Sequence, residues 1–187
     1  MVFFHDRKRN RLQGYDYSSF GYYFVTICAK ERYKFFGEVV HGTMILNKIG
    51  QIAHREWMQT ARLRKNVRLD SFVVMPNHVH GILQIISCNG MVCFGRGVRP
   101  RAPTDKTNHT RAYGKLPAHS LGAIINNYKS AVTKWCNENG HGHFHWQRNY
   151  HDHIIRDETA LQKIREYIAM NPAKWDIDRN NLKNCWK

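Results

Sequence analysis

The 187-residue sequence predicts an α+β fold, a ferredoxin-like antiparallel sheet with helices packed mainly on one face. Strand-like and helix-like runs alternate along the chain, and once an early hairpin is set aside their order is βαββαβ. Hydrophobic residues make up 42% of the chain and aromatic residues 12%, which is enough to form a core. With a mean hydropathy of −0.59, the sequence has no apolar run long enough to cross a bilayer, so no membrane partner is expected.

The first half of the chain is predicted to contain two strands and a helix. Tyr22–Ala29 is rich in aromatic and β-branched residues, which is typical of a buried strand. Glu38–Leu46 is predicted as a second strand, with a turn at His41-Gly42. Between Asn47 and Arg64 apolar residues recur at near-helical spacing, which predicts an amphipathic helix.

A hairpin is predicted in the middle of the chain. Val67–Met75 and His78–Ile86 are both strand-like, and only Pro76-Asn77 separates them. The following residues, Ser87–His119, lose all periodicity and are rich in Gly, Pro, Arg, Thr and Asn. We expect a mobile basic loop at about 87–119 within a single domain that spans residues 1–187.

The last third of the chain is predicted to return to helix, strand and helix. Ser120–Asn139 has a helical apolar stripe, with Ser120 as N-cap and Gly140 as C-terminal stop. His153–Arg156 is a short strand candidate. Asp157 is expected to cap a final helix that ends before Pro172, because the residue before a proline avoids the α region.

The charge balance favours a nucleic-acid partner. Lys and Arg number 29 against 14 acidic residues, which gives a net charge of +15 and a pI of about 9.9. Such a surface attracts phosphate backbones through counterion release. The basic residues cluster at Arg7–Arg11, Arg62–Arg68 and Arg96–Arg101.

The cysteines and the N-terminus indicate a cytoplasmic protein. The number of cysteines is odd and none forms a CxxC pair, so reduced thiols are expected. The N-terminal charges follow the apolar residues, which is the wrong order for a secretory signal. The cysteines are Cys28, Cys88, Cys93, Cys136 and Cys185.

Two histidines form the sharpest local motif. On a strand, residues two apart point to the same face, so His78 and His80 present two imidazoles side by side. A pair at this spacing can chelate a divalent ion. The alternative is that both are polar residues on a solvated sheet face.

A second pair lies on the final helix. Tyr167 and Asn171 are four residues apart and therefore share one face. Asn171 offers an oxygen suited to a hard cation, and Tyr167 offers a phenol beside it. The alternative is a tyrosine at the edge of the core and an asparagine at a helix end.

Together these motifs resemble a known family. Four segments carry the resemblance. They are VVMPNHVHGIL, which contains His78-Val79-His80, YIAMNP, which contains Tyr167, and the earlier segments RNRLQGYDYS and YFVTIC. The chain resembles the HUH single-tyrosine transposases of the insertion-sequence type, and most closely the REP-associated tyrosine transposases. The resemblance covers nearly the whole chain.

The resemblance implies a metal-dependent reaction on DNA. It implies that His78, His80 and a polar residue one turn after the tyrosine, here Asn171, hold Mg²⁺ or Mn²⁺. Related transposases often have glutamine at this third position, so His153 stays open as a substitute ligand. Tyr167 would attack DNA to form a 5′-phosphotyrosine, which a 3′-hydroxyl then resolves. A homodimer is compatible with this activity, and the tyrosine could act in its own or a partner's site.

Single-stranded or hairpin DNA is the implied partner. Aromatic residues beside cations suit base stacking along a charged groove, and Tyr15 and Tyr17 lie near the N-terminal cluster, although Tyr22 and Tyr23 also fit a strand. Tyr150 is a further candidate for DNA contact, whereas Tyr128 belongs to an apolar stripe. The candidate nucleic-acid-binding residues are Arg7, Arg9, Arg11, Arg99, Arg101 and Arg148.

Two other functions compete with strand transfer. A non-catalytic ferredoxin-like nucleic-acid-binding protein would bind by stacking, but the sequence lacks an RNP-like run on a predicted central strand. A metallohydrolase that uses activated water would release a free 5′-phosphate and tolerate Tyr167→Phe. Strand transfer instead predicts a covalent protein–DNA adduct.

Overall fold

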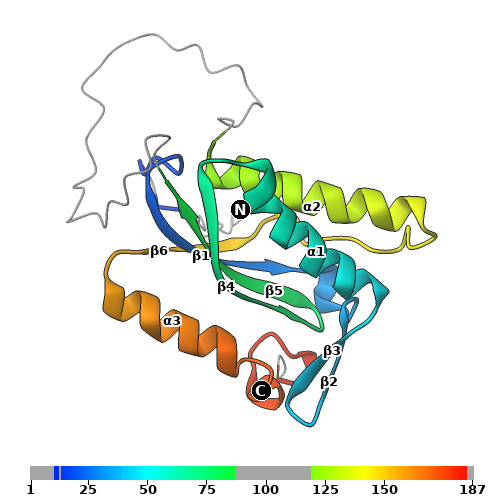
Figure 1. The fold of residues 1–187 in the computed structure, drawn as a ribbon. Helices are drawn as coiled ribbons and strands as arrows, with labels where there is room; N and C mark the ends of the chain where they lie inside the picture. The colour runs from blue at the N-terminus through cyan, green and yellow to red at the C-terminus, as the bar shows by residue number, and fades with distance from the viewer. Residues whose placement is uncertain (1–10, 13, 87–118, 185–187) are drawn as a thin grey trace, which may run out of the picture.

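The computed structural model describes residues 11–12, 14–86 and 119–184, and these residues form a four-stranded antiparallel sheet with three helices (Figure 1). The strands lie in the order β4-β5-β1-β6 and pair antiparallel throughout, which is the ferredoxin-like arrangement. The predicted fold class is therefore confirmed. The strands are β1 (Gly21–Cys28), β4 (Val67–Met75), β5 (His78–Ile85) and β6 (His151–Ile155), and the helices are α1 (Lys48–Leu63), α2 (Leu121–Glu138) and α3 (Glu158–Met170).

The two longer helices cover one face of the sheet, and α3 lies across the other (Figure 1). Val25 and Val79 belong to the larger hydrophobic cluster, together with Trp57 of α1 and Val132 of α2. A second cluster joins Ile82 of β5 and Ile155 of β6 to Leu161 and Ile168 of α3. Alternate residues of β5 therefore serve two different packing layers.

The segment predicted as one strand with a turn is a hairpin that forms its own two-stranded sheet. Its strands are β2 (Gly37–Val40) and β3 (Thr43–Leu46). The predicted turn lies between them, where His41 and Gly42 have φ angles of 48° and 74°. The short helical turn η1 (Lys30–Arg32) connects β1 to this hairpin.

Side-chain caps fix where each main helix begins. The side chains of Asn47, Ser120 and Asp157 accept hydrogen bonds from backbone N–H groups of the first turns of α1, α2 and α3. The predicted caps at Ser120 and Asp157 are thus confirmed. After α3 the chain forms two short 3₁₀ turns, η2 (Trp175–Ile177) and η3 (Leu182–Asn184).

A β-bulge in β4 sets which residues face α3. Leu69 pairs with Leu83 and Phe72 pairs with Gly81, so two residues of β4 oppose one residue of β5. The extra residue reverses the alternation, so Leu69 and Phe72 both pack against the larger cluster and Val73, which pairs with His80, packs against the second. Asp70 lies within the bulge and forms an ion pair with Arg165 of α3.

Several sequence predictions concern membranes, thiols and the basic loop. Within the described ranges, the structure has no helix that is both long and apolar enough to cross a membrane. Cys28 and Cys136 are buried free thiols, as expected. Residues 87–118 of the predicted loop lie outside the described residues, as do Arg7, Arg9, Arg99 and Arg101.

Gly81 allows α1 to lie directly on β5. A Cβ atom at this position would be 2.3 Å from Cζ2 of Trp57, which is fully buried. Real Cβ atoms do not approach a ring so closely, so either the indole or the strand would have to move. A movement of the strand would also shift His80, the neighbouring residue.

We expect Gly81→Ala to destabilise the protein by about 3 kcal/mol, the upper part of the usual range for an overpacked core. Urea denaturation of the variant and the wild type measures this difference. Trp57→Phe introduced together with Gly81→Ala makes room for the methyl group and should recover part of the loss. A Gly81→Ala protein as stable as the wild type would contradict this account of the packing.

A candidate metal and tyrosine site

The two histidines of the motif are buried side by side between the sheet and α3. His78 pairs with Cys28 of β1 and His80 with Thr26, in the centre of the sheet. The centroids of their rings lie 4.4 Å apart, and the exposed fractions of His78 and His80 are 0% and 1%. The alternative of a solvated sheet face is therefore wrong.

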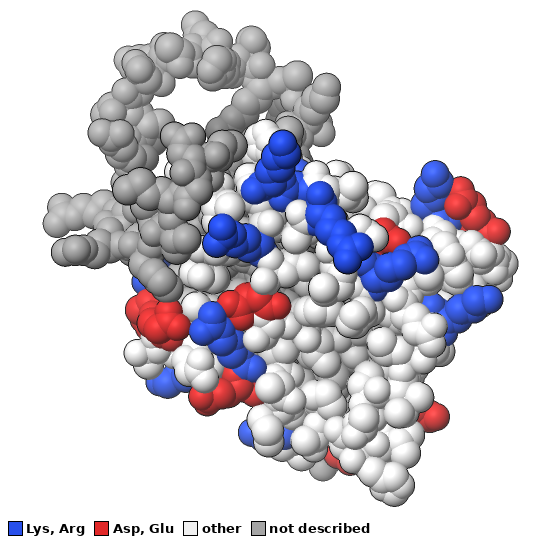
Figure 2. Space-filling view, viewed as in Figure 1, with Lys and Arg blue, Asp and Glu red and all other residues white. Residues whose placement is uncertain are grey.

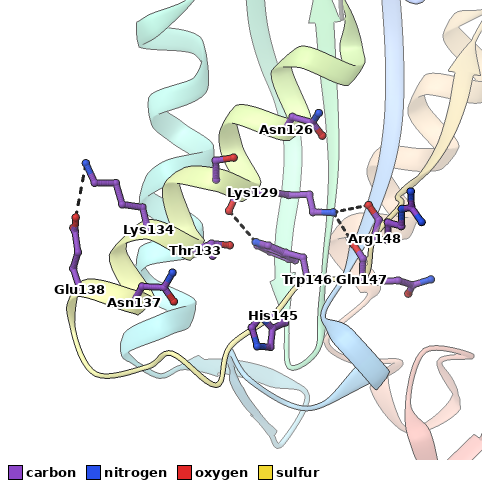
Figure 3. Close-up of a pocket in the computed structure, with 11 residues that line it drawn as sticks. Asn126, Lys129, Thr133, Lys134, Asn137, Glu138, His145, Trp146, Gln147 and Arg148 are labelled. Carbon is purple, nitrogen blue, oxygen red and sulfur yellow. Dashed lines mark hydrogen bonds and ion pairs between the residues drawn. The ribbon is translucent and has the colours of Figure 1, made fainter. Parts of the chain in front are cut away.

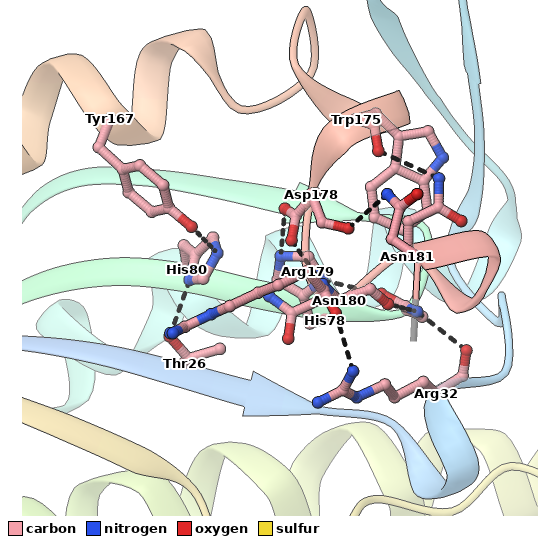
Figure 4. Close-up of polar contacts among 12 residues, drawn as sticks. Thr26, Arg32, His78, His80, Tyr167, Trp175, Asp178, Arg179, Asn180 and Asn181 are labelled. Atoms are coloured by element: carbon pink, nitrogen blue, oxygen red, sulfur yellow. Dashed lines mark hydrogen bonds and ion pairs between the residues drawn. The ribbon is translucent and has the colours of Figure 1, made fainter. Parts of the chain in front are cut away.

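A carboxylate from the C-terminal segment completes the cluster. Oδ2 of Asp178 lies 3.9 Å from Nε2 of His78. One potential ligand atom from each of His78, His80 and Asp178 lies within 4.8 Å of the others (Figure 4). Sequence reasoning missed Asp178, because no motif or helical spacing relates it to the histidines. The available signal was that Asp176 and Asp178 are the two carboxylates that follow α3.

The site contains buried polar atoms that the protein itself does not satisfy. Nε2 of His78, Oδ2 of Asp178 and Oδ1 of Asn171 are buried without a hydrogen-bond partner among the described residues. Burial of such groups costs free energy unless a ligand compensates for it. Imidazole nitrogens and carboxylate or amide oxygens are together suited to a divalent cation. The residues present therefore fit a metal ion.

Tyr167 lies at the rim of this cluster (Figure 4). Its hydroxyl is 3.2 Å from Nε2 of His80, and its side chain is 41% exposed. Its ring and that of Phe24 of β1 pack edge to face. The phenol thus contacts a buried imidazole on one side and is open to a substrate on the other.

Burial keeps both imidazoles neutral. Desolvation lowers the pKa of His78 well below its ordinary value, and the neighbouring His80, Arg32 and Arg179 lower it further. Desolvation and Arg179 lower the pKa of His80 to about 3. Neutral imidazole is the form that binds a metal.

The environment of Tyr167 acts on its pKa in both directions. Burial raises the pKa of the phenol, and the charge of Asp178 raises it further. A hydrogen bond with Asn171 and the charge of Arg179 lower the pKa. Asn171 is thus brought next to Tyr167, as the helical spacing predicted.

A two-armed ion pair holds α3 against β4. Arg165 donates from Nε and Nη2 to Asp70, at 2.9 and 2.7 Å. It also donates to Glu158 at 3.2 Å. Because Tyr167 is two residues further along α3, this pair helps to set where the phenol lies.

We expect Arg165→Met to lower the free energy of unfolding by about 1 kcal/mol at neutral pH. The hydrogen bond from Arg165 lowers the pKa of Asp70. A carboxylate with a lowered folded pKa stabilises above its unfolded pKa, near ~4, and this stabilisation is lost as the pH falls through the folded value. Urea denaturation should therefore show the gap between variant and wild type closing in acid. A gap that stays constant with pH would contradict the ion pair, and Arg55→Met, which breaks a pair on α1, is the control.

Other candidate residues lie apart from this cluster. His153 is exposed on β6, opposite Phe24. Tyr128 is a core residue that donates to the carbonyl of Ala53, as its apolar stripe indicated. Tyr150 is buried and accepts a hydrogen bond from Arg11.

The N-terminal aromatic residues form a packed group. Tyr15 and Tyr17 lie edge to face and both pack near Tyr23. Tyr23 is fully buried and donates to the carbonyl of Ser19, so it is a core strand residue. Arg11 lies over the rings of Tyr17 and Tyr150.

Comparison with known proteins agrees with the fold. The structure of a REP-associated tyrosine transposase bound to a REP hairpin aligns with a TM-score of 0.55 at 17% identity, over 90% of this chain and 74% of that chain. The fold is thus that of a REP-associated tyrosine transposase, and the resemblance read from the sequence is confirmed at this level. No protein-family model matches the chain.

A sequence relative places the chain in a family. An uncharacterized protein of Haemophilus influenzae is 37% identical over 180 residues, which cover 94% of this chain and 93% of that protein. The chain belongs to the same family as this Haemophilus influenzae protein.

Proposed function

We propose that this protein cleaves and rejoins single-stranded DNA, in hairpin or repeat form, through a 5′-phosphotyrosine on Tyr167. The observation that carries the proposal is the position of the Tyr167 hydroxyl, 3.2 Å from Nε2 of His80 at the rim of a buried His-His-Asp cluster. A partly exposed phenol beside a set of metal ligands is the arrangement that phosphoryl transfer to tyrosine requires. The transposase fold supports the same function.

We assign Mg²⁺ or Mn²⁺ to the cluster, with His78 and His80 as ligands. Asp178 supplies a carboxylate and Asn171 an amide oxygen, and both atoms lack another partner among the described residues. A bound cation would polarise the scissile phosphate as a Lewis acid. His153 is exposed on a different strand and is the less suited third ligand.

The tyrosine performs the bond exchange. In the forward step Oη of Tyr167 bonds to phosphorus and the bond from phosphorus to the 3′ oxygen breaks. The phenol loses a proton and the leaving 3′ oxygen gains one, so the step is balanced. Burial and the charge of Asp178 raise the pKa of Tyr167 overall, and Asn171 and the charge of Arg179 oppose that rise. A 3′-hydroxyl reverses the exchange, and rejoining needs no ATP because the phosphotyrosine ester conserves the bond energy.

The contact made by the phenol supports a proposal that it acts within one chain. Tyr167 contacts His80 of its own chain, which favours a site built from a single copy. Mixing His78→Ala protein with Tyr167→Phe protein tests this inference. Adduct formation by the mixture, in which neither protein is active alone, would instead require a homodimer that shares its tyrosines.

We assign the DNA backbone to basic residues outside the cluster. Lys and Arg side chains gather on the upper part of the face in Figure 2, where acidic side chains are fewer, whereas Asp and Glu lie among the cations around α3. Arg11 and Arg148 are exposed. Arg148 also lines a polar groove between α2 and residues 145–148, where Lys129 holds the backbone carbonyls of Gln147 and Arg148 (Figure 3).

We expect Arg148→Ala to weaken DNA binding for all sequences alike and to reduce the slope of log affinity against log salt by about 0.7 to 1. Fluorescence anisotropy with a labelled hairpin at several salt concentrations measures both effects. Arg55→Ala is the control, since Arg55 is paired with Glu56 on α1. An unchanged slope for Arg148→Ala would remove this residue from the interface.

The test of the function is a search for covalent protein–DNA adducts. The wild type would be incubated with Mn²⁺ and with hairpin oligonucleotides labelled at either end, then denatured and separated. Strand transfer predicts that DNA on the 3′ side of the cut stays attached to the protein and that the other product ends in a 3′-hydroxyl. Cleavage with a free 5′-phosphate would establish a hydrolase. Tight binding of hairpins with no cleavage would establish a binding protein.

A further inference from the structure

We infer that Asn77 is a positioning residue that holds His78 as one tautomer and ties the segment bearing Asp178 to the same imidazole. This inference rests on the proposed metal site, although its main readout needs neither metal nor DNA. Asn77 lies in the turn between β4 and β5 and is fully buried. Its amide reaches three segments that are far apart in sequence.

The amide of Asn77 has one orientation. Its Nδ2 atom donates to the carbonyl of Arg32 at 2.9 Å and to the carbonyl of Asn180 at 2.8 Å. Two carbonyl acceptors require the NH₂ group on that side, so Oδ1 faces Nδ1 of His78 at 2.8 Å. An exchange of the two amide atoms would set oxygen against oxygen twice.

The orientation of the amide determines where the proton of His78 lies. Oδ1 of Asn77 only accepts hydrogen bonds, so Nδ1 of His78 must be the donor. The lone pair of the neutral ring is then on Nε2, the atom that faces Asp178. Outer partners that fix the ring orientation and tautomer of a ligand in this way are typical of metal-binding histidines.

The same amide holds the C-terminal segment. Asn180 is two residues after Asp178, so the bond from Asn77 to its carbonyl places the carboxylate as well. Arg32 also holds the C-terminal segment, because its guanidinium donates to the carbonyl of Arg179 at 2.9 Å. Glu31 and Arg32 themselves have φ angles of 54° and 55°, which are strained for residues other than glycine. The bonds made by Asn77 and Arg32 link this strained turn to the site, and Figure 4 shows Arg32 and Arg179 beside His78.

His80 has no equivalent partner. Its Nδ1 atom is 2.9 Å from the hydroxyl of Thr26, and its Nε2 atom is 3.2 Å from the hydroxyl of Tyr167. A hydroxyl both donates and accepts, so neither contact fixes the tautomer. The two histidines of the motif are thus held differently, and only His78 is locked by an acceptor.

Nitrogen chemical shifts of the histidine rings in the metal-free protein test the inference. For the wild type we expect His78 to show a protonated Nδ1 and an unprotonated Nε2. Asn77→Ala should shift His78 toward the other tautomer and lower Mn²⁺ affinity, measured by calorimetry, by about 10- to 100-fold. Asn77→Asp keeps the acceptor but loses both donors. It should keep the tautomer of His78 and still lose affinity, because the C-terminal segment is released.

Two variants serve as matched controls. Thr26→Val removes the partner of His80 and should change the shifts of His80 while leaving those of His78 unchanged. Asn184→Ala removes bonds to the carbonyls of Asp176 and Asp178 without touching His78. It should lower Mn²⁺ affinity with the His78 tautomer intact.

The inference is overturned if wild-type His78 carries its proton on Nε2, or if a folded Asn77→Ala protein keeps both the tautomer and the affinity. If Asn77→Ala does not fold, the wild-type shifts and the Asn77→Asp protein decide the question. A wild type that binds Mn²⁺ with the expected tautomer but never forms a DNA adduct would overturn the proposed function and leave the role of Asn77 standing.

Discussion

Tyr167→Phe is expected to abolish the covalent protein–DNA adduct while DNA and Mn²⁺ affinities stay within about two-fold of the wild type. The substitution removes only the hydroxyl that we propose as the nucleophile, together with its contact to Nε2 of His80. The ring can keep its packing against Phe24 and His80, and the partly exposed position makes a large loss of stability unexpected. Denaturing electrophoresis of labelled oligonucleotides measures the adduct, and anisotropy measures binding.

Tyr128→Phe is the matched control for this experiment. Tyr128 is buried on the opposite side of the sheet, and its hydroxyl donates to the carbonyl of Ala53 at 3.1 Å. Its loss should cost about 1 kcal/mol of stability and leave adduct formation intact. An adduct that persists in Tyr167→Phe and disappears in another tyrosine variant would move the nucleophile elsewhere.

His78→Ala is expected to lower Mn²⁺ affinity by more than about 100-fold, which exceeds the usual effect of residues that only orient a ligand. The substitution removes one of the two imidazoles proposed as ligands, and with it the nitrogen that lies 3.9 Å from the buried Oδ2 atom of Asp178. Adduct formation should fall with metal occupancy, and chelation of the metal should reproduce the loss in the wild type. Calorimetry with Mn²⁺ measures the affinity without DNA.

The same measurement identifies the third ligand. Asp178→Asn keeps the shape of the side chain and removes its charge, whereas Asn171→Ala removes the amide oxygen. A large loss of Mn²⁺ affinity in either variant would identify the substituted residue as a ligand. His153→Ala is the control because His153 is exposed on β6, and it should bind Mn²⁺ as the wild type does. A loss in His153→Ala with none in Asp178→Asn would reverse this assignment.

The fold class and most of its elements could be predicted from the sequence because local signals agreed with the tertiary arrangement. Ser120 and Asp157 are predicted caps whose hydrogen bonds are present, and the two β-rich runs around Pro76 pair as a hairpin. The separate sheet of β2 and β3 was not predicted. Nor was the position of α3 across the opposite face, because pairing and packing partners depend on contacts between distant segments.

The site was predictable only where it follows regular periodicity. The period of two on β5 brings His78 and His80 together, and the spacing of four on α3 brings Tyr167 next to Asn171. Asp178 lies in an irregular segment whose course depends on backbone bonds to Asn77 and Arg32. No periodic pattern describes such a segment, so its carboxylate becomes visible only in three dimensions.

The alternation of β5 places residues of a packing interface and residues of the His-His-Asp cluster next to each other along the chain. Val79 and Gly81 belong to the interface with α1 and α2, while His78 and His80 belong to the His-His-Asp cluster, and all four are consecutive. Cores are densely packed and transmit small displacements, so a change that tightens the α1 interface also moves the imidazoles. Laboratory evolution toward higher thermal stability should therefore tolerate few substitutions on β5 and find its gains on the outer surfaces of α1 and α2.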